Sequence, residues 1–135
     1  LIEVRMANEV LCVRLATARI TLEELDHLEG ICATFREIMA TRDIRRIMEL
    51  DRGFHETIAS ASRNPILIEI LKGVHGRAQR FWALSIENES HLQEIADEHE
   101  AVFGAMKNRD AETAAEAIKT HINSFRNSML TSNRQ

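Results

Sequence analysis

The chain has 135 residues, of which 44% are hydrophobic and 28% charged, and these proportions are typical of one soluble globular domain large enough to bury a core. A single Pro, five Gly and no Tyr argue against a strand-and-turn protein, whereas the abundance of Ala, Leu, Ile, Glu and Arg favours helices. The net charge of −4 offers no electrostatic footprint for nucleic acid, and no apolar run approaches the roughly 20 residues of a membrane span.

The two cysteines indicate the cellular compartment of the protein, and the first residue indicates the extent of the whole protein. Cys12 and Cys32 lie within apolar helical patterns, so we expect buried free thiols in a reducing compartment and a cytoplasmic location. Leu1 already lies within a helical pattern, and we therefore expect a piece of a longer protein. We expect residues 1–135 to form a single domain.

The first predicted helix covers residues 1–19 and is apolar on two sides. One line holds Val4, Leu11, Cys12, Leu15 and Ala16, and the other holds Ile2, Met6, Val10 and Val13. A helix of this kind is usually sandwiched, either within its own bundle or against another subunit. Arg5 and Asn8 fall within the first line. Either Arg5 reaches out to water and Asn8 bonds to the backbone, or both face a polar cavity.

Helix start signals divide the next part of the chain. Thr21 and Glu24 form a capping box that opens a helix running to about Ala40. Asp43 is placed to cap a third helix, which ends near Ser62.

A fourth helix begins where Asn64 precedes Pro65, the preferred order of an N-cap and a first helical position. We expect it to run to about Ile86 and to bury one apolar stripe. That stripe consists of Leu67, Ile70, Leu71, Val74, Ala78 and Phe81. Residues 86–89 read as a connection, and Ser90 and Gln93 offer a second capping box for a fifth helix.

The last helices flank a break at residues 108–110, where Asp110 is placed to cap the sixth helix. Because all connections are short, neighbouring helices should be antiparallel, which predicts an all-α bundle of six to seven helices. His27, His75 and His91 lie off the apolar stripes, and we expect them near the surface.

Four ionisable residues nevertheless occupy stripe positions on three helices. Asp51 and His55 are four residues apart and share one helical face, and His99 and His121 lie in the stripes of the fifth and sixth helices. Burying these groups without partners is costly. Singly, a buried histidine is more often hydrogen-bonded than a metal ligand, but the four together favour convergence on one divalent cation in a central cavity.

The spacing of the glutamates and histidines along the chain excludes two other kinds of metal site. A di-iron carboxylate bundle needs Glu three residues before each histidine, whereas Ala96 and Ile118 stand at those positions. The His-Glu-x-x-His sequence of helical zinc proteases is absent. A metal with open positions can still activate water, so a metal-dependent enzyme on a helical bundle remains an alternative. A purely structural bundle with a hydrogen-bonded polar core is another.

Short segments in order along the whole chain resemble one known family. They are Glu3-Val4-Arg5, Asp51 with Phe54-His55, Asn64-Pro65-Ile66-Leu67, Glu98-His99, and Asp110-Ala111-Glu112 continuing to His121-Ile122. The set is similar to the FadR-type C-terminal (FCD) domain of GntR-family transcription regulators. The resemblance implies a helical effector-binding bundle whose metal ligands match Asp51, His55, His99 and His121. Asn8 departs from the family, which usually has an apolar residue there.

The resemblance further implies a regulator that is not an enzyme. In such proteins a winged-helix DNA-binding domain precedes this one, and a small metabolite, commonly a carboxylate, binds near the metal. We expect Arg5, Asn8 and Arg77 to contact that ligand, because a guanidinium suits a carboxylate. Zn²⁺ or Ni²⁺ fits the ligand set best, with Mn²⁺ or Co²⁺ also suitable. We expect a homodimer, with DNA bound only through a winged-helix domain outside residues 1–135.

Overall fold

The computed structural model describes the backbone of residues 1–84 and 89–133 and the side chains of residues 1–84 and 91–130. Six α-helices and one short 3-10 helix follow one another in this part of the chain, which contains no strand. They are α1 (Ile2–Arg19), α2 (Leu22–Ile38), η1 (Met39–Thr41), α3 (Ile44–Ala61), α4 (Pro65–Trp82), α5 (Glu89–Lys107) and α6 (Ala111–Asn133). The predicted all-α bundle is confirmed.

The helix caps predicted for α2 and α4 are present in the structure. Thr21 accepts a hydrogen bond from the Glu24 amide while the Glu24 carboxylate accepts one from the Thr21 amide, so the capping box of α2 is complete. The Asn64 side chain caps α4, with Pro65 at its first position. The predicted cap Ser90 lies within α5, but its side chain, like residues 85–88 of the predicted connection, is outside the described part.

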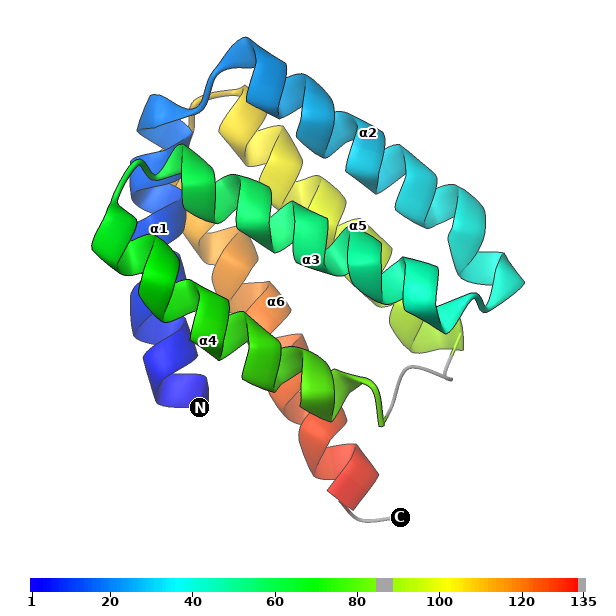
Figure 1. Ribbon diagram of the computed structural model, residues 1–135. Helices are drawn as coiled ribbons and strands as arrows, with labels where there is room; N and C mark the ends of the chain where they lie inside the picture. The colour runs from blue at the N-terminus through cyan, green and yellow to red at the C-terminus, as the bar shows by residue number, and fades with distance from the viewer. Residues whose placement is uncertain (85–88, 134–135) are drawn as a thin grey trace.

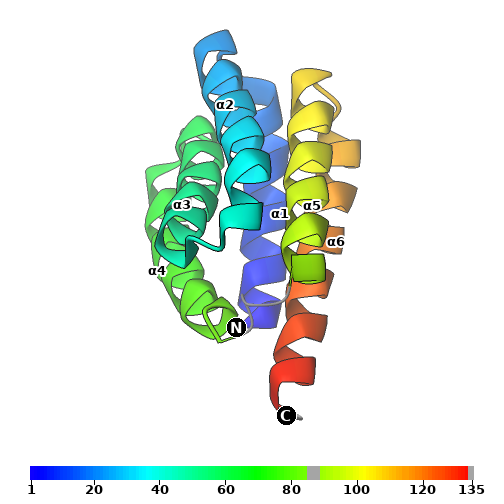
Figure 2. The same ribbon diagram turned by 90° about the vertical axis from the view of Figure 1, so that its right-hand side faces the viewer.

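Helices that follow one another in the chain run antiparallel (Figure 1). Seen from the side, α3 and α4 form one flank, and α5 and α6 form the other (Figure 2). Helix α1 contacts α3 and α4 on one side and α6 on the other, while α2 packs on α3 and α5. All six α-helices contribute buried side chains to the interior of the bundle.

Two apolar clusters fill the interior, one around Phe54 and one around Phe35. His99 of α5 lies between these two rings: its ring centroid is 4.1 Å from that of Phe54 and 5.3 Å from that of Phe35. A polar group is thus held where the two clusters meet.

The buried faces of α1 and α4 differ from the prediction. On α1, Val4 and Leu11 are exposed, whereas Val13, assigned to the second apolar line and to a possible subunit contact, is fully buried. On α4, Ile70 and Phe81 are exposed. The inward sides of both helices carry polar residues instead, namely Arg5, Glu9, Thr17 and Gln79. The other predicted residues Cys12 and Ala16 of α1 and Leu67, Leu71, Val74 and Ala78 of α4 are buried as expected. The apolar pattern alone did not reveal the polar residues that share these inward faces.

Candidate metal centre and effector cavity

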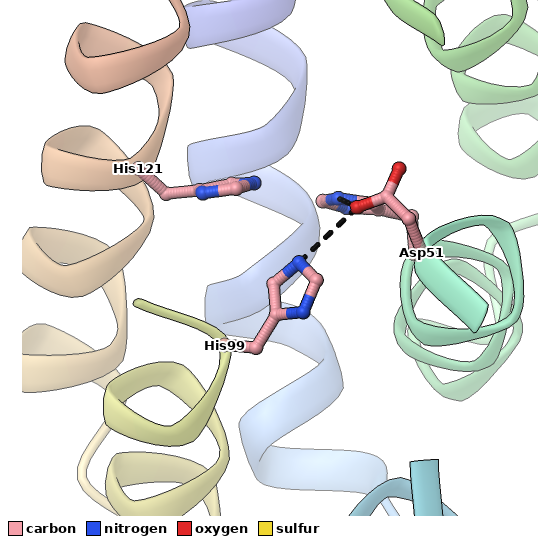
Figure 3. A group of neighbouring side chains, drawn as sticks. Asp51, His99 and His121 are labelled. Carbon is pink, nitrogen blue, oxygen red and sulfur yellow. Dashed lines mark ion pairs between the residues drawn. The ribbon is translucent and has the colours of Figure 1, made fainter. Parts of the chain in front are cut away.

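Asp51, His55, His99 and His121 converge in the interior from three helices. One ligand atom from each lies within 4.8 Å of the others, and all four side chains are buried. The Asp51 Oδ1 atom is 3.3 Å from His55 Nε2 and 3.2 Å from His99 Nε2. Figure 3 shows the His99 and His121 rings, which come from the neighbouring helices α5 and α6, pointing toward the Asp51 carboxylate of α3. The convergence expected from the sequence is present in the structure.

Three further polar side chains hold His121, His55 and Asp51 in position. The His121 Nδ1 atom is 2.7 Å from Glu98 Oε1, and the His55 Nδ1 atom is 3.5 Å from Glu9 Oε1. The amide of Gln79 donates to Asp51 Oδ2 at 3.1 Å and to the Met48 carbonyl at 2.9 Å. With the Nδ1 atoms of His55 and His121 facing carboxylates, their Nε2 atoms are left to face the centre, as in proteins where a carboxylate orients a metal-binding histidine.

The three histidines differ in protonation because their charged neighbours differ. Burial lowers the pKa of His55, but the Asp51 and Glu9 carboxylates outweigh it and raise this pKa to about 9. Burial lowers the pKa of His99 to about 4, against the opposing pull of Asp51. Burial, with the charges of His55 and Arg5, lowers the pKa of His121 to about 3. His99 and His121 are therefore neutral at pH 7, the form that binds metals.

The acids of the site are ionised despite their burial. Burial alone raises the pKa of Asp51, but His55 and His99 outweigh it and hold this pKa well below its usual value. Arg5, His55 and His75 do the same for the pKa of Glu9. The interior thus offers two ionised carboxylates, Asp51 and Glu9, and two neutral imidazoles, His99 and His121.

His99 tests whether these residues fit a metal ion. Both of its ring nitrogens are buried without a hydrogen-bond partner, although the Nε2 atom lies close to Asp51. A buried polar atom that forms no hydrogen bond is uncommon and costs stability. A cation between Asp51 and the three imidazoles would bind the Nε2 lone pair, and three imidazoles with one carboxylate are a common donor set for Zn²⁺ and similar ions. The residues fit the group.

A partly open cavity of about 410 Å³, including its mouth, adjoins this cluster. Its wall combines polar groups with aromatic and aliphatic surface. The lining residues are Arg5, Asp51, His55, His75, Ala78, Gln79, Trp82, His91, Ile95, Glu98, His121 and Phe125. A concave site with a few convergent polar groups is the usual form of a small-molecule pocket.

Of the three residues predicted to contact the ligand, only Arg5 lines this cavity. Its Nε atom donates to the Glu9 carboxylate, and its guanidinium lies 4.6 Å from the centre of the Phe125 ring. Asn8 instead donates to the Val4 carbonyl at 2.7 Å on the outer side of α1, which is the backbone bond of the first interpretation. Arg77 is exposed. Its Nη1 atom donates to the Gly73 carbonyl at 3.4 Å on the outer part of α4.

Two histidines expected near the surface belong to the interior. The side chains of His75 and His91 are each only 11% exposed, and both line the cavity. His75 Nε2 is 3.1 Å from Glu9 Oε1, so His75, Glu9 and His55 form a second group of possible ligands beside the first. The sequence interpretation missed these roles because the inward side of α4 was set by its apolar residues alone. His27, in contrast, is exposed as predicted.

Glu9 was also missed, although one signal was available. It follows Arg5 by four residues, the spacing at which an acid and a base meet on a helix, and Arg5 was already placed on an inward line. Cys12 and Cys32 are buried free thiols as predicted, and burial raises the pKa of each thiol to about 12.

Comparison with known proteins gives three results that agree with this geometry. The FCD domain model matches residues 1–124. The galactonate operon transcriptional repressor of Escherichia coli (strain K12) is 28% identical over 124 residues, which cover 89% of this chain and 52% of the repressor. A solved structure, E. coli McbR/YncC, superposes with a TM-score of 0.83 at 21% identity, covering 98% of this chain and 62% of that one.

The chain therefore spans about half the length of the curated relative it matches. The matched relative is a transcriptional repressor rather than an enzyme. Among the described helices, none has a stretch long and apolar enough to cross a bilayer.

Proposed function

The chain belongs to the FCD domain family, and from this premise we propose that it is the effector-sensing domain of a GntR-family transcription regulator. In this proposal it binds a small organic acid beside a divalent metal ion and transmits the bound state to a DNA-binding domain. The observation that carries it is the meeting of Asp51, His55, His99 and His121 at the wall of a cavity that also holds Arg5.

The metal would be held by Asp51 and the three histidines, with Glu98 and Glu9 orienting two of the rings. We propose Zn²⁺ or Ni²⁺, with Mn²⁺ or Co²⁺ also compatible with three imidazoles and a carboxylate. When bound, the ion supplies open coordination positions for an oxygen ligand. The protein's own residues supply the shape of the cavity and the other polar groups that line it.

Arg5 supports the choice of an organic acid as effector. Its guanidinium is buried at the cavity wall and bonds Glu9 through Nε, which leaves further N–H groups to bind a carboxylate. Gln79 and Glu98 add an amide and a carboxylate that suit hydroxyl groups. Because the matched repressor is named for a galactonate operon, we propose a hydroxylated acid of the aldonate type as the first ligand to test.

The transmission step follows from the position of α1. This helix carries Arg5 and Glu9 and contacts α3, α4 and α6, so a ligand that binds Arg5 acts on the element at the centre of the bundle. In the proposed regulator, which we place in the cytoplasm, a winged-helix domain N-terminal to this segment binds DNA. An effector that favours one arrangement of the bundle would change the DNA affinity through α1.

The test combines metal analysis with ligand titration. We expect the chain, purified without chelators, to carry about one equivalent of metal, and aldonates to raise its melting temperature only when metal is bound. His99→Ala should lose both metal and ligand. Arg5→Lys should keep the metal but lose most of the ligand affinity, because an ammonium cannot bind bidentately, whereas the exposed control Arg77→Ala should keep both. Unchanged metal content and ligand affinity in His99→Ala would overturn the proposal.

The alternative of a metal-dependent enzyme has no observation in its favour, since the relative matched is a transcriptional repressor. The same titration distinguishes it, because an enzyme would convert the bound acid and a sensor would release it unchanged.

A further inference from the structure

A second group of polar side chains lies beside the metal centre, where α1, α3 and α4 contact one another. Glu9 of α1, His55 of α3 and His75 of α4 each offer one ligand atom, and these atoms lie within 4.8 Å of one another. Only His55 also belongs to the first group, where it faces Asp51. Glu9 and His55 are 4% and 5% exposed, and the His75 side chain is 11% exposed. The second group is therefore buried almost as deeply as the first.

The Glu9 carboxylate divides its two oxygens between different partners. Its Oε2 atom accepts a hydrogen bond from Arg5, whereas its Oε1 atom lies 3.1 Å from His75 Nε2 and 3.5 Å from His55 Nδ1. In a tetrahedral zinc site with nitrogen and oxygen ligands at about 2.0–2.2 Å, neighbouring donor atoms are about 3.3–3.6 Å apart. The two distances from Oε1 are close to this spacing, so the donors need to move little to bind one ion.

The surroundings of His75 leave its inner nitrogen without a hydrogen bond. The His75 Nε2 atom is buried and forms no hydrogen bond with any described residue, although Glu9 lies near it. Such an atom costs stability. A cavity of about 220 Å³, including its mouth, adjoins the group, and apart from these three residues only Cys12 and aliphatic side chains line it. A cation between Glu9 and His75 would bind the Nε2 lone pair, which nothing else in this cavity does.

We propose that Glu9, His55 and His75 form a second binding site for a divalent cation such as Zn²⁺. Two imidazoles and one glutamate are the protein ligands of many zinc sites that keep an open position for water or another ligand. His55 and His75 line the larger cavity as well as the small one, so the second site lies between the two cavities.

The two sites share His55, and this makes them unequal. A neutral imidazole carries its proton on one nitrogen and offers a lone pair on the other. When the His55 Nε2 atom binds an ion beside Asp51, the proton is on Nδ1 and faces Glu9, and the second site keeps only Glu9 and His75 as ligands. The positive charge of Arg5 next to Glu9 weakens the second site further. The second site therefore fills after the first and binds its ion more weakly.

Titration of the metal-free chain with Zn²⁺ in a calorimeter tests the second site. We expect one tight and one weaker equivalent of Zn²⁺ per wild-type chain. Loss of a residue that only orients a ligand already weakens metal binding about 10- to 100-fold, so His75→Ala should raise the dissociation constant of the weaker equivalent at least about tenfold. His75→Phe, which keeps a ring but offers no lone pair, should have the same effect. Both variants should keep the tight equivalent, which shows that they are folded.

His91→Ala is the matched control. The side chains of His91 and His75 are each 11% exposed and both line the larger cavity, but His91 belongs to neither group of ligands. This variant should bind both equivalents like the wild type. A wild-type chain that binds a single equivalent, or His75 variants that keep the weaker one, would overturn the proposal. An equal loss in His91→Ala would overturn the assignment to His75.

Diffraction locates the second ion directly. In crystals soaked with excess Zn²⁺, anomalous scattering should show a peak about 2.0–2.2 Å from both Glu9 Oε1 and His75 Nε2, in addition to the peak at Asp51. A second peak bound only by other residues would contradict the assigned ligands. This inference goes beyond the proposed function, and the two fail separately: loss of the weaker equivalent leaves the first site intact, whereas a wild-type chain without the tight equivalent contradicts the proposed function alone.

Discussion

At the residue scale, the carboxylate of Glu98 is the partner of a histidine that would bind the metal. It lies 2.7 Å from His121 Nδ1 in a buried contact, where burial raises the pKa of Glu98. We expect Glu98→Gln to weaken Zn²⁺ binding about 10- to 100-fold, because the amide neither orients the ring as firmly nor raises its basicity. Competition with a chromophoric chelator measures this loss. Glu116→Gln, an exposed change on α6, is the control and should bind Zn²⁺ like the wild type.

The protonation of His55 leads to a second prediction at this scale. Its pKa of about 9 means that it is charged at pH 7 in the metal-free chain, whereas His99 and His121, with pKa values of about 4 and 3, are neutral. Metal binding requires the neutral ring and so should release about one proton per ion at pH 7. Affinity should rise about tenfold per pH unit from 7 toward 9 and then level off. Calorimetry in two buffers of different ionisation enthalpy counts the proton, and a count near zero or near three would contradict this assignment.

At the element scale, the helix caps depend on local chemistry alone. Thr21 and Asn64 each accept a hydrogen bond from an amide in the first turn of their helix. We expect Thr21→Ala and Asn64→Ala each to lower the free energy of unfolding by about 1 kcal/mol. Urea denaturation of the metal-free chain gives this value. A loss below a few tenths of a kcal/mol in both variants would show that water replaces the cap without cost.

Helix α4 shows where the element scale no longer suffices. Its N-cap and its start were predicted correctly, and Leu67, Leu71, Val74 and Ala78 are buried as expected. The helix ends at Trp82 rather than near Ile86, however, and Ile70 and Phe81 are exposed while Gln79 is buried. A stripe of apolar residues fixes the inward side only when the interior is apolar. Here the inward side carries His75 and Gln79 toward Glu9 and Asp51.

At the scale of the whole molecule, the polar interior should make stability depend on the metal. Without an ion, the Asp51 carboxylate is shared by two imidazoles and His99 keeps two buried nitrogens that form no hydrogen bond. An ion that binds only the folded chain adds about 4 kcal/mol at a free concentration 1,000 times its dissociation constant. We expect removal of metal by a chelator to lower the melting temperature by at least several degrees, and added Zn²⁺ to restore it.

The matching control uses a chain that lacks one ligand. His121→Ala should show a smaller difference in melting temperature with and without chelator than the wild type, because one of the four ligands is missing. If the wild type melts at one temperature in both conditions, the polar interior is satisfied by its own contacts and the metal has no structural role.

The sequence by itself determined the helices, the N-caps of α2, α3, α4 and α6, and the four residues on inward positions, because each of these depends on neighbours within about four residues. Asp51 and His55 could be paired from their spacing alone. The resemblance to the FCD family indicated that these four residues are metal ligands. The family itself is confirmed.

Only the tertiary structure decided which other groups join them. Glu9, His75 and Gln79 come from α1 and α4, and their distances to His55 and Asp51 depend on how helices far apart in sequence cross. The same crossing turned Asn8 and Arg77 outward while Arg5 remained inside. A helical repeat gives the angle between residues on one helix, but the rotation of each helix about its own axis is set by the packing of all the others.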